Sequence, residues 1–227
     1  MAAACAWTWL GRVDYAEGLQ LQARLAAQRK EGEGVDRLLL LEHPHVFTLG
    51  RQTKIEDLLW DEAERDRRAV QVHAIDRGGE ITYHGPGQLV GYPIIDLSSY
   101  GRDLHAYVRR LEETLIQALA GWGVAAERAP GFPGVWVGQD KIAAIGVHVS
   151  RWVSTHGFAL NVDTDLDYFA GIVPCGLDDR GVTSVRALCG RAPGLPEAAA
   201  DVAARFGAVF GAEMVVEQSL AVLERNW

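Results

Sequence analysis

Cysteine is scarce in this sequence, and the three that are present lie far apart, at Cys5, Cys175 and Cys189. They are too few and too widely spaced for a disulfide framework or for a CxxC metal-binding motif. The seven histidines show neither the HExxH motif nor another ligand spacing, so we expect no metal centre. The cysteine content therefore predicts reduced thiols and a cytoplasmic protein.

Long apolar runs and an excess of positive charge are also missing. No segment approaches the roughly 18 uninterrupted apolar residues of a membrane-spanning helix, and no basic segment precedes an apolar one at the N-terminus. Lysine and arginine number 22 against 30 aspartate and glutamate residues, a net charge of -8. Because nucleic-acid backbones bind to concentrated basic faces, we expect a soluble protein with neither a membrane nor a nucleic-acid partner.

Hydrophobic residues make up 48% of the 227 residues, enough to bury the core of a single domain spanning residues 1–227. Helical periodicity and capping residues predict helices at about 15–28, within 54–68, at 104–119 after an N-cap at Asp103, and from Pro196 onward. Short apolar runs predict strands at 38–41, 70–74, 135–137, 142–149 and 154–162. This order, with an antiparallel meander at its centre, favours an α+β fold over a doubly wound parallel sheet.

The segment RGGEITYHGPGQ, residues 77–88, combines four glycines and a proline between two strand-like stretches. Glycine lets the backbone approach a ligand closely, and the surrounding side chains can donate hydrogen bonds to a polar head group or a thioester carbonyl. Those side chains are Arg77, Thr82, Tyr83, His84 and Gln88. From the spacing alone, an ordinary glycine-rich hairpin is an equally good interpretation. The segment is not a phosphate loop, because it has neither Gly-Lys-Ser/Thr nor GxGxxG.

Cys175 is the candidate nucleophile. It follows Pro174 and precedes Gly176, so its thiol is predicted to lie on a turn. A free cysteine is more often a small buried hydrophobic residue, and the local sequence alone slightly favours that interpretation. Burial is a stronger expectation for Cys5, in a predicted strand, and for Cys189, at a predicted helix end.

Lys141 is the candidate partner of this thiol. A thiol attacks as its thiolate, so it benefits from a nearby cation or base, and Lys141 opens a strand after a turn. A lone lysine beside a turn is most often a solvent-facing side chain. His84, His148 and His156 are alternative bases, although each is equally suited to a structural hydrogen bond in a strand.

Four motifs, RGGEITYHGPGQLVGYPIIDL, KIAAIGVHV, HGFALNV and PCG, occur in that order and together resemble the lipoyl(octanoyl) transferase family over about residues 42–185. The resemblance implies a fold similar to that of biotin and lipoate protein ligases, which is class II synthetase-like, with a mixed, largely antiparallel sheet flanked by helices. It also implies a Cys175/Lys141 dyad and no cofactor. The acyl pocket that it implies is formed by Arg77, Gly78, Gly79, Glu80, Ile81, Thr82, Tyr83, His84, Ala144, Ile145, Gly146, Gly157, Phe158 and Ala159.

The reaction that the resemblance implies has two steps joined by a thioester on Cys175. The thiolate first attacks octanoyl-acyl carrier protein, and Lys141 then takes the proton of the attacking lysine amine. Backbone donors near Gly78-Gly79 or Cys175-Gly176 are expected to hold the oxyanion. The implied acceptors are lipoyl domains of 2-oxoacid dehydrogenase E2 subunits and the glycine cleavage H protein. Phe158 stands where leucine is more usual in the family, and we expect it to narrow the acyl tunnel.

Three other functions are consistent with the same residues. An ATP-dependent lipoate or biotin protein ligase of this fold would form an acyl-adenylate, would not need Cys175, and would use Lys141 to bridge carboxylate and phosphate. A non-catalytic carrier-binding module would use the glycine-rich segment for docking alone. A cysteine hydrolase with His84 or His156 as its base would release free octanoate.

Overall fold

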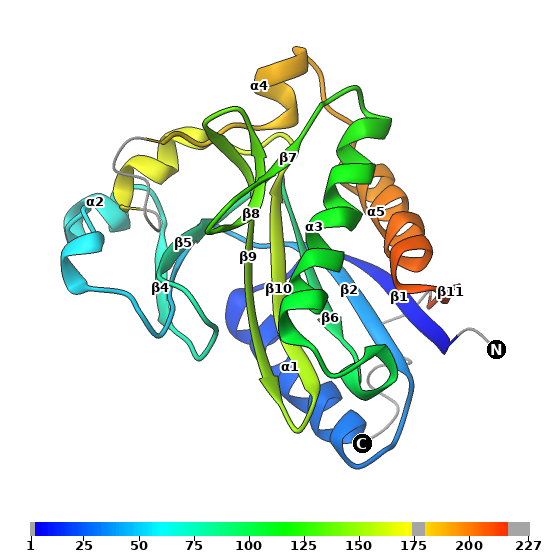
Figure 1. Ribbon diagram of the computed structural model, residues 1–227. Coiled ribbons are helices and arrows are strands. Elements are labelled where there is room, and N and C mark those ends of the chain that lie inside the picture. The colour runs from blue at the N-terminus through cyan, green and yellow to red at the C-terminus, as the bar shows by residue number, and fades with distance from the viewer. Residues whose placement is uncertain (1–2, 174–179, 218–227) are drawn as a thin grey trace.

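The computed structural model describes residues 3–173 and 180–217, and Figure 1 shows two sheets flanked by helices. Among these residues the larger sheet has eight strands in the spatial order β11-β1-β2-β6-β10-β9-β8-β7. Their bounds are β1 Ala3–Arg12, β2 Asp36–Glu42, β6 Gln88–Ile94, β7 Glu127–Ala129, β8 Phe132–Val137, β9 Asp140–Ser150, β10 Val153–Asn161 and β11 Ala212–Val216. The smaller sheet has the order β4-β3-β5, formed by β3 Val46–Leu49, β4 Gln71–Ala74 and β5 Ile81–His84.

Helices cover both faces of the larger sheet. Helix α1, Tyr15–Lys30, packs on one face, and α3, Leu104–Gly121, and α5, Leu195–Phe210, pack side by side on the other (Figure 1). None of the helices within the described residues is long and apolar enough to span a membrane. The shorter helices are η1 Ile55–Asp57, α2 Glu62–Arg67, η2 Leu97–Tyr100, η3 Leu166–Gly171 and α4 Val185–Cys189.

The leucine run in β2 packs against helices on both faces of the larger sheet. Side chains alternate across a strand, so Leu38 and Leu40 pack toward α3 and α5, whereas Leu39 and Leu41 pack toward α1. All four are essentially inaccessible to solvent. A strand covered on both faces is continuously apolar, which is why this run was correctly predicted as a buried strand.

The main helices begin where their capping residues predict. The Asp103 carboxylate accepts a hydrogen bond from the Ala106 amide at 3.0 Å, and α3 then buries Leu111, Leu115 and Leu119 before it ends at Gly121. The N-cap of α1 is Asp14, which accepts from the Ala16 amide. Pro196 lies in the first turn of α5, where its missing N–H costs nothing. The predictions of these three helices are confirmed.

Strands β8, β9 and β10 form the predicted antiparallel meander. β9 and β10 pair from Ala143 opposite Leu160 to Ser150 opposite Val153. The turn between them, Arg151-Trp152, has positive φ at both residues, as a two-residue type I′ hairpin requires. Among the described strands, parallel pairs occur only between β11 and β1, β1 and β2, and β3 and β4. The sheets are therefore mixed and largely antiparallel, as predicted.

The smaller sheet holds the glycine-rich segment against the larger one. Phe47 on β3, Tyr83 on β5 and Ile172 after η3 form a separate apolar cluster beneath it. β4 lies at the predicted position, but most of its residues are exposed. The chain between β4 and β5 then crosses to β9, where the Gly78 amide donates to Val147 O at 3.1 Å.

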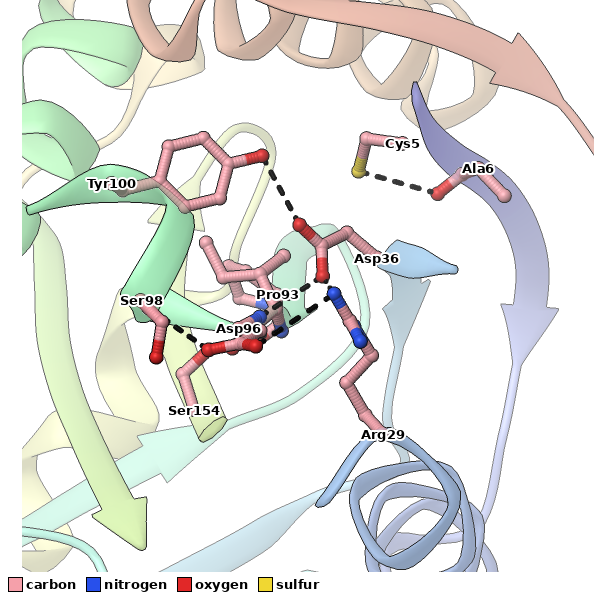
Figure 2. Close-up of polar contacts among 10 residues, drawn as sticks. Cys5, Ala6, Arg29, Asp36, Pro93, Asp96, Ser98, Tyr100 and Ser154 are labelled. Atoms are coloured by element: carbon pink, nitrogen blue, oxygen red, sulfur yellow. Dashed lines mark hydrogen bonds and ion pairs between the residues drawn. The ribbon is translucent and has the colours of Figure 1, made fainter. Parts of the chain in front are cut away.

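Asp36, at the start of β2, is a buried carboxylate that joins three elements (Figure 2). It accepts hydrogen bonds from Arg29 Nε of α1 at 2.8 Å, from the Asp96 amide at 2.9 Å, and from the Tyr100 hydroxyl of η2 at 3.1 Å. A buried charge needs such partners to offset the loss of hydration. Cys5 lies opposite Asp36 on the neighbouring strand β1.

Candidate active site

A cavity of about 750 Å³ lies between the glycine-rich segment, β9, β10, helix α3 and the β7–β8 hairpin. Lys141 lines it, together with all but one of the residues implied for the acyl pocket. These are Arg77, Gly78, Gly79, Glu80, Ile81, Thr82, His84, Ala144, Ile145, Gly146, Gly157, Phe158 and Ala159. Three segments that are remote in the sequence therefore meet at one cavity.

Tyr83 is the residue that the structure places elsewhere. Side chains alternate along β5, so Thr82 and His84 line the cavity while Tyr83 points into the cluster beneath the smaller sheet. Its ring is fully buried and stacks on Tyr168. Its hydroxyl shares a hydrogen bond of 2.8 Å with His45 Nδ1. Tyr83 is therefore the one residue implied for the acyl pocket that does not line this cavity.

Arg77 anchors one wall of the cavity. Its guanidinium donates to Thr48 O at 3.0 Å and to Thr48 Oγ1 at 2.9 Å, and the residue is only 7% exposed. The side chain crosses directly over Gly146 of β9, where a Cβ atom would lie 2.9 Å from Arg77 Cδ. Glycine at position 146 therefore lets the arginine lie flat against the sheet.

The glycine-rich backbone is largely occupied with protein contacts. The Gly78 amide donates to Val147 O, so of the backbone donors expected near Gly78-Gly79 or Cys175-Gly176 this one is not available to an oxyanion. Gly50 approaches the same segment so closely that a Cβ there would lie 2.3 Å from Gly79 O. Close backbone approach was expected here, but at these positions the partner is the protein itself.

A series of hydrogen bonds leads from residue 183 to the cavity. The Asn161 amide Nδ2 donates to Thr183 O at 3.0 Å, and Gln88 Nε2 donates to Asn161 Oδ1 at 2.9 Å and to Tyr83 O at 3.1 Å. Gln88 Oε1 lies 2.8 Å from His84 Nδ1. Both hydrogen-bond donors of Gln88 are therefore used within the protein. One of the two ring nitrogens of His84 is also hydrogen-bonded within the protein, to Gln88.

Lys141 is the second residue of β9 and lies beside the aromatic side chain of Trp136. The two residues are paired across β8 and β9, and the Lys141 ammonium lies 4.8 Å from the Trp136 ring centroid. On its other side, Lys141 forms a parallel bridge with Val182. The lysine is half-buried and faces the cavity, so the solvent-facing position that is usual beside a turn does not apply.

Cys175 lies outside the described residues, so its distance to Lys141 is not part of the geometry. The chain before it is held where the Val173 amide donates to Asp57 O at 2.8 Å. The chain after it is held beside Lys141, where the Thr183 amide donates to Lys141 O at 3.0 Å. Arg180 packs against the Trp136 ring, at 4.9 Å from its centroid.

The two described cysteines differ in environment. Cys5 is buried, as expected, and burial together with nearby Asp36 raises the pKa of its thiol to about 12. It is therefore a poor nucleophile near neutral pH. Cys189 is exposed at the end of α4, so the expectation that it is buried was wrong. Its helix has only five residues and leaves its last turn in solvent.

The histidines proposed as alternative bases make structural contacts. His156 Nε2 lies 2.9 Å from Asp76 Oδ1, and burial lowers its pKa although the carboxylate opposes that shift. His156 has φ of 56° within β10, a conformation that is strained for a residue other than glycine. His148 lies 3.7 Å from the other oxygen of Asp76. No group of three or more potential metal ligands occurs among the described residues.

One wall of the cavity was not recognised from the sequence. Leu104, Val108 and Glu112 are spaced four residues apart, so they share one face of α3, and Phe132 and Pro133 of the β7–β8 hairpin lie across from them. The helical periodicity of residues 104–119 predicted the helix but not that one of its faces lines a cavity. The first turn of α3 extends beyond the hydrophobic core, so Leu104 is 45% exposed and can line a cavity.

Comparison with known proteins identifies close relatives and a shared fold. The family model of the lipoyl protein ligase A/B catalytic domain matches residues 14–207. The octanoyltransferase of Solibacter usitatus is 54% identical over 217 residues, covering 96% of this chain and 98% of that protein. A crystal structure of lipoate-protein ligase A bound with ATP covers 100% of this chain and 94% of its own at 16% identity, with a TM-score of 0.77. The biotin protein ligase of Aquifex aeolicus covers 91% of this chain and 69% of its own at 14% identity, with a TM-score of 0.52. The predicted ligase-like α+β fold is confirmed.

Proposed function

Since this chain belongs to the octanoyltransferases of the lipoyl protein ligase A/B family, we propose that it transfers an octanoyl group to a specific lysine of lipoyl domains. The donor is octanoyl-acyl carrier protein. The acceptors are the lipoyl domains of 2-oxoacid dehydrogenase E2 subunits and the glycine cleavage H protein. The protein acts in the cytoplasm, where its nucleophilic thiol stays reduced.

In the first step, the Cys175 sulfur attacks the thioester carbonyl of the donor. The bond between that carbon and the carrier's sulfur breaks, and the carrier leaves as a free thiol after taking up the proton that Cys175 has lost. Lys141 takes that proton first, so its ammonium favours the thiolate form of Cys175, and it becomes neutral again when it gives the proton to the carrier's sulfur. One thioester replaces another, so the step needs no nucleotide.

In the second step, the ε-amine of the acceptor lysine attacks the acyl-enzyme. A carbon–nitrogen bond forms, the carbon–sulfur bond breaks, and Cys175 regains its thiol proton. Neutral Lys141 takes the proton that the attacking nitrogen must lose and passes it to the sulfur. Formation of an amide from a thioester is strongly downhill, which makes the transfer effectively one-way.

The observation that carries this proposal is the position of Lys141 at the cavity formed by the implied acyl-pocket residues. Ala144 and Ala159, paired across β9 and β10, have a single side-chain carbon each, so they leave room in the cavity for an unbranched acyl chain. The segment that resumes at residue 180 pairs with Lys141 through Val182. This connection supports a Cys175/Lys141 pair on neighbouring parts of the chain.

The test compares Cys175→Ala with Cys189→Ala as a matched control, because Cys189 is exposed at the end of α4. Each enzyme is incubated with octanoyl-acyl carrier protein and a lipoyl domain in the absence of nucleotide, and both proteins are weighed by intact-mass spectrometry. Wild type and C189A should carry an octanoyl adduct and modify the lipoyl domain. The rate of octanoyl transfer by C175A should be more than about 1,000-fold lower than that of wild type.

Three other outcomes would each support one of the alternative functions, a ligase, a hydrolase or a docking module. A requirement for ATP with retained activity in C175A would indicate the ligase reaction. Release of free octanoate with an unmodified lipoyl domain would indicate a hydrolase. Binding of the carrier with no adduct on either protein would indicate a docking module. Each of these three results contradicts octanoyl transfer to the lipoyl domain through a thioester on Cys175.

A further inference from the structure

The orientation of His84 at the cavity is determined by the hydrogen bonds behind it. A backbone carbonyl can only accept, so Thr183 O fixes which end of Asn161 is the amino group. By the same reasoning, Tyr83 O fixes the amino end of Gln88. The atom of Gln88 that faces His84 is therefore the carbonyl oxygen Oε1. An oxygen that only accepts requires His84 Nδ1 to carry the hydrogen.

With its hydrogen on Nδ1, a neutral His84 has a lone pair on Nε2. His84 lines the cavity, is 7% exposed, and has no hydrogen-bond partner for Nε2 among residues 3–173 and 180–217. Its ring is stacked on Tyr15 with centroids 6.0 Å apart. The residue therefore presents a fixed acceptor to the cavity. The sequence had suggested the opposite, a donor for a thioester carbonyl.

His84 stays neutral throughout the physiological range. Burial is the main cause that lowers the pKa of His84 to about 3, and His43, Arg77 and His156 act in the same direction, while the bond to Gln88 opposes them. A group with so low a pKa is a poor proton acceptor near neutral pH. Its lone pair can accept a hydrogen bond without the transfer of a proton.

We propose that His84 Nε2 accepts a hydrogen bond from the ε-amine of the acceptor lysine while that amine attacks the acyl-enzyme. This inference rests on the proposed function. The attacking nitrogen becomes positively charged as its bond to the carbonyl carbon forms, so its N–H groups become stronger donors in the transition state. A fixed acceptor then stabilises the transition state more than the bound amine, and this raises kcat with little change in KM. The proton itself goes to Lys141 and then to the Cys175 sulfur.

The chemistry of the reactants favours the amine as the partner. An octanoyl chain has no hydrogen to donate, a developing oxyanion is repelled by a lone pair, and a thiol is a weak donor. Amide groups of the donor carrier are the other strong hydrogen-bond donors among the reactants. They act only in the first step, so separate measurement of the two steps distinguishes them from the amine.

The test uses the variant His84→Phe, which keeps a ring against Tyr15 and removes the acceptor. Acyl-enzyme is formed from octanoyl-acyl carrier protein, isolated, and mixed with a lipoyl domain in single turnovers. Formation of the acyl-enzyme should stay within about threefold of wild type. Transfer at saturating lipoyl domain should fall by about 10- to 100-fold, the effect of losing one hydrogen bond to a charged group. The pH dependence of the remaining transfer should keep the inflection of wild type, because His84 does not titrate there.

The matched control is His148→Phe, because His148 is on β9 but does not line the cavity. It should leave both steps unchanged. Equal slowing of both steps in H84F, or loss of the pH inflection, would overturn the proposal. If H84F does not fold, nitrogen-15 NMR of wild type gives the answer, since a protonated Nε2 at pH 7 is incompatible with an acceptor. Failure of wild type to form any acyl-enzyme would instead contradict the proposed function, and the NMR result would stand by itself.

Discussion

Phe158 and Gly91 form a size-matched pair within the larger sheet. They are directly opposite each other on β10 and β6. A Cβ atom at position 91 would lie 2.1 Å from Phe158 Cζ, so the ring occupies the space that a side chain would need. Phe158 is 3% exposed and lines the cavity. The glycine on the neighbouring strand therefore accommodates the phenyl ring of Phe158.

Gly91→Ala should destabilise the protein by about 1–3 kcal/mol, because the added methyl group forces the phenyl ring out of its position. In the Phe158→Ala variant the ring is absent, so the added methyl group has room. The loss of unfolding free energy caused by Gly91→Ala should then be close to zero. Urea unfolding of wild type, both single variants and the double variant measures this coupling. An equal cost of G91A in both backgrounds would show that the strain lies elsewhere.

The residues of the site divide into those that the sequence could predict and those that it could not. The ordered motifs singled out Arg77, Lys141 and the small residues of β9 and β10, and these residues line one cavity. They could not show whether His84 donates or accepts a hydrogen bond. That property depends on Gln88 and Asn161, and Asn161 comes from a strand much later in the chain. Hydrogen-bond roles follow from tertiary contacts, which leave no local pattern.

At the scale of elements, Glu112 connects α3 to the β7–β8 hairpin. Its carboxylate is 1% exposed and accepts hydrogen bonds from Arg109 at 2.8 Å, from Arg128 at 3.1 Å, and from the Gly134 amide at 3.2 Å. Arg128 and Gly134 come from β7 and β8, respectively. The same hairpin carries the aromatic ring beside the Lys141 ammonium, so this carboxylate holds part of the site in place.

Glu112→Ala should cost about 3–5 kcal/mol of unfolding free energy, since it removes the shared acceptor from a buried group of charges. It should also speed hydrogen exchange at the Gly134 amide, which loses its partner. The control is Arg151→Ala, which breaks an ion pair with Glu31 whose side chains are 60% and 67% exposed. That change should cost less than about 1 kcal/mol. A small effect of E112A, similar to that of R151A, would show that the hairpin is held by packing alone.

The elements that were predicted are those with local signals. α3 has an N-cap, regular apolar spacing and a terminal glycine, and β9 and β10 are long and connected by a short turn. β3 and β5 have four residues each, and their pairing gives no periodic pattern of useful length. The parallel pairing of β11 with β1 joins opposite ends of the described chain, so it was also invisible from local sequence.

At the scale of the whole molecule, two buried histidines make the fold sensitive to acid. His43 Nδ1 donates to Val13 O and its Nε2 accepts from the Tyr92 hydroxyl, each at 2.7 Å. Burial lowers the pKa of His43 to about 4 and that of His84 to about 3, from an ordinary value of 6.5. Their rings lie 5.9 Å apart, so protonation of one opposes protonation of the other.

The direction of the pH effect follows from which state binds protons. Below pH 6.5 the unfolded chain protonates both histidines, whereas the folded protein keeps them neutral, so acid favours unfolding. The stabilisation is complete above pH 6.5 and is lost as the pH falls toward 4. Carboxylates such as Asp163, whose pKa is lowered by Arg186, add to this loss only below about pH 4.

Because His43 and His84 stay neutral in the folded protein, the free energy of unfolding should fall by about 3 kcal/mol per pH unit below pH 6. Each proton that the unfolded chain takes up contributes about 1.4 kcal/mol per pH unit. Between pH 6.5 and 4 this loss adds up to about 6–7 kcal/mol, a large part of the roughly 5–15 kcal/mol by which domains are stable. Urea titrations at several pH values between 7.5 and 4.5 measure the slope. H84F should make the slope shallower, since the proton of His84 is no longer taken up on unfolding, while His43 and His156, whose pKa values burial also lowers, keep the rest of it. A slope that is flat between pH 6 and 5, or unchanged in H84F, would mean that these histidines are protonated in the folded protein.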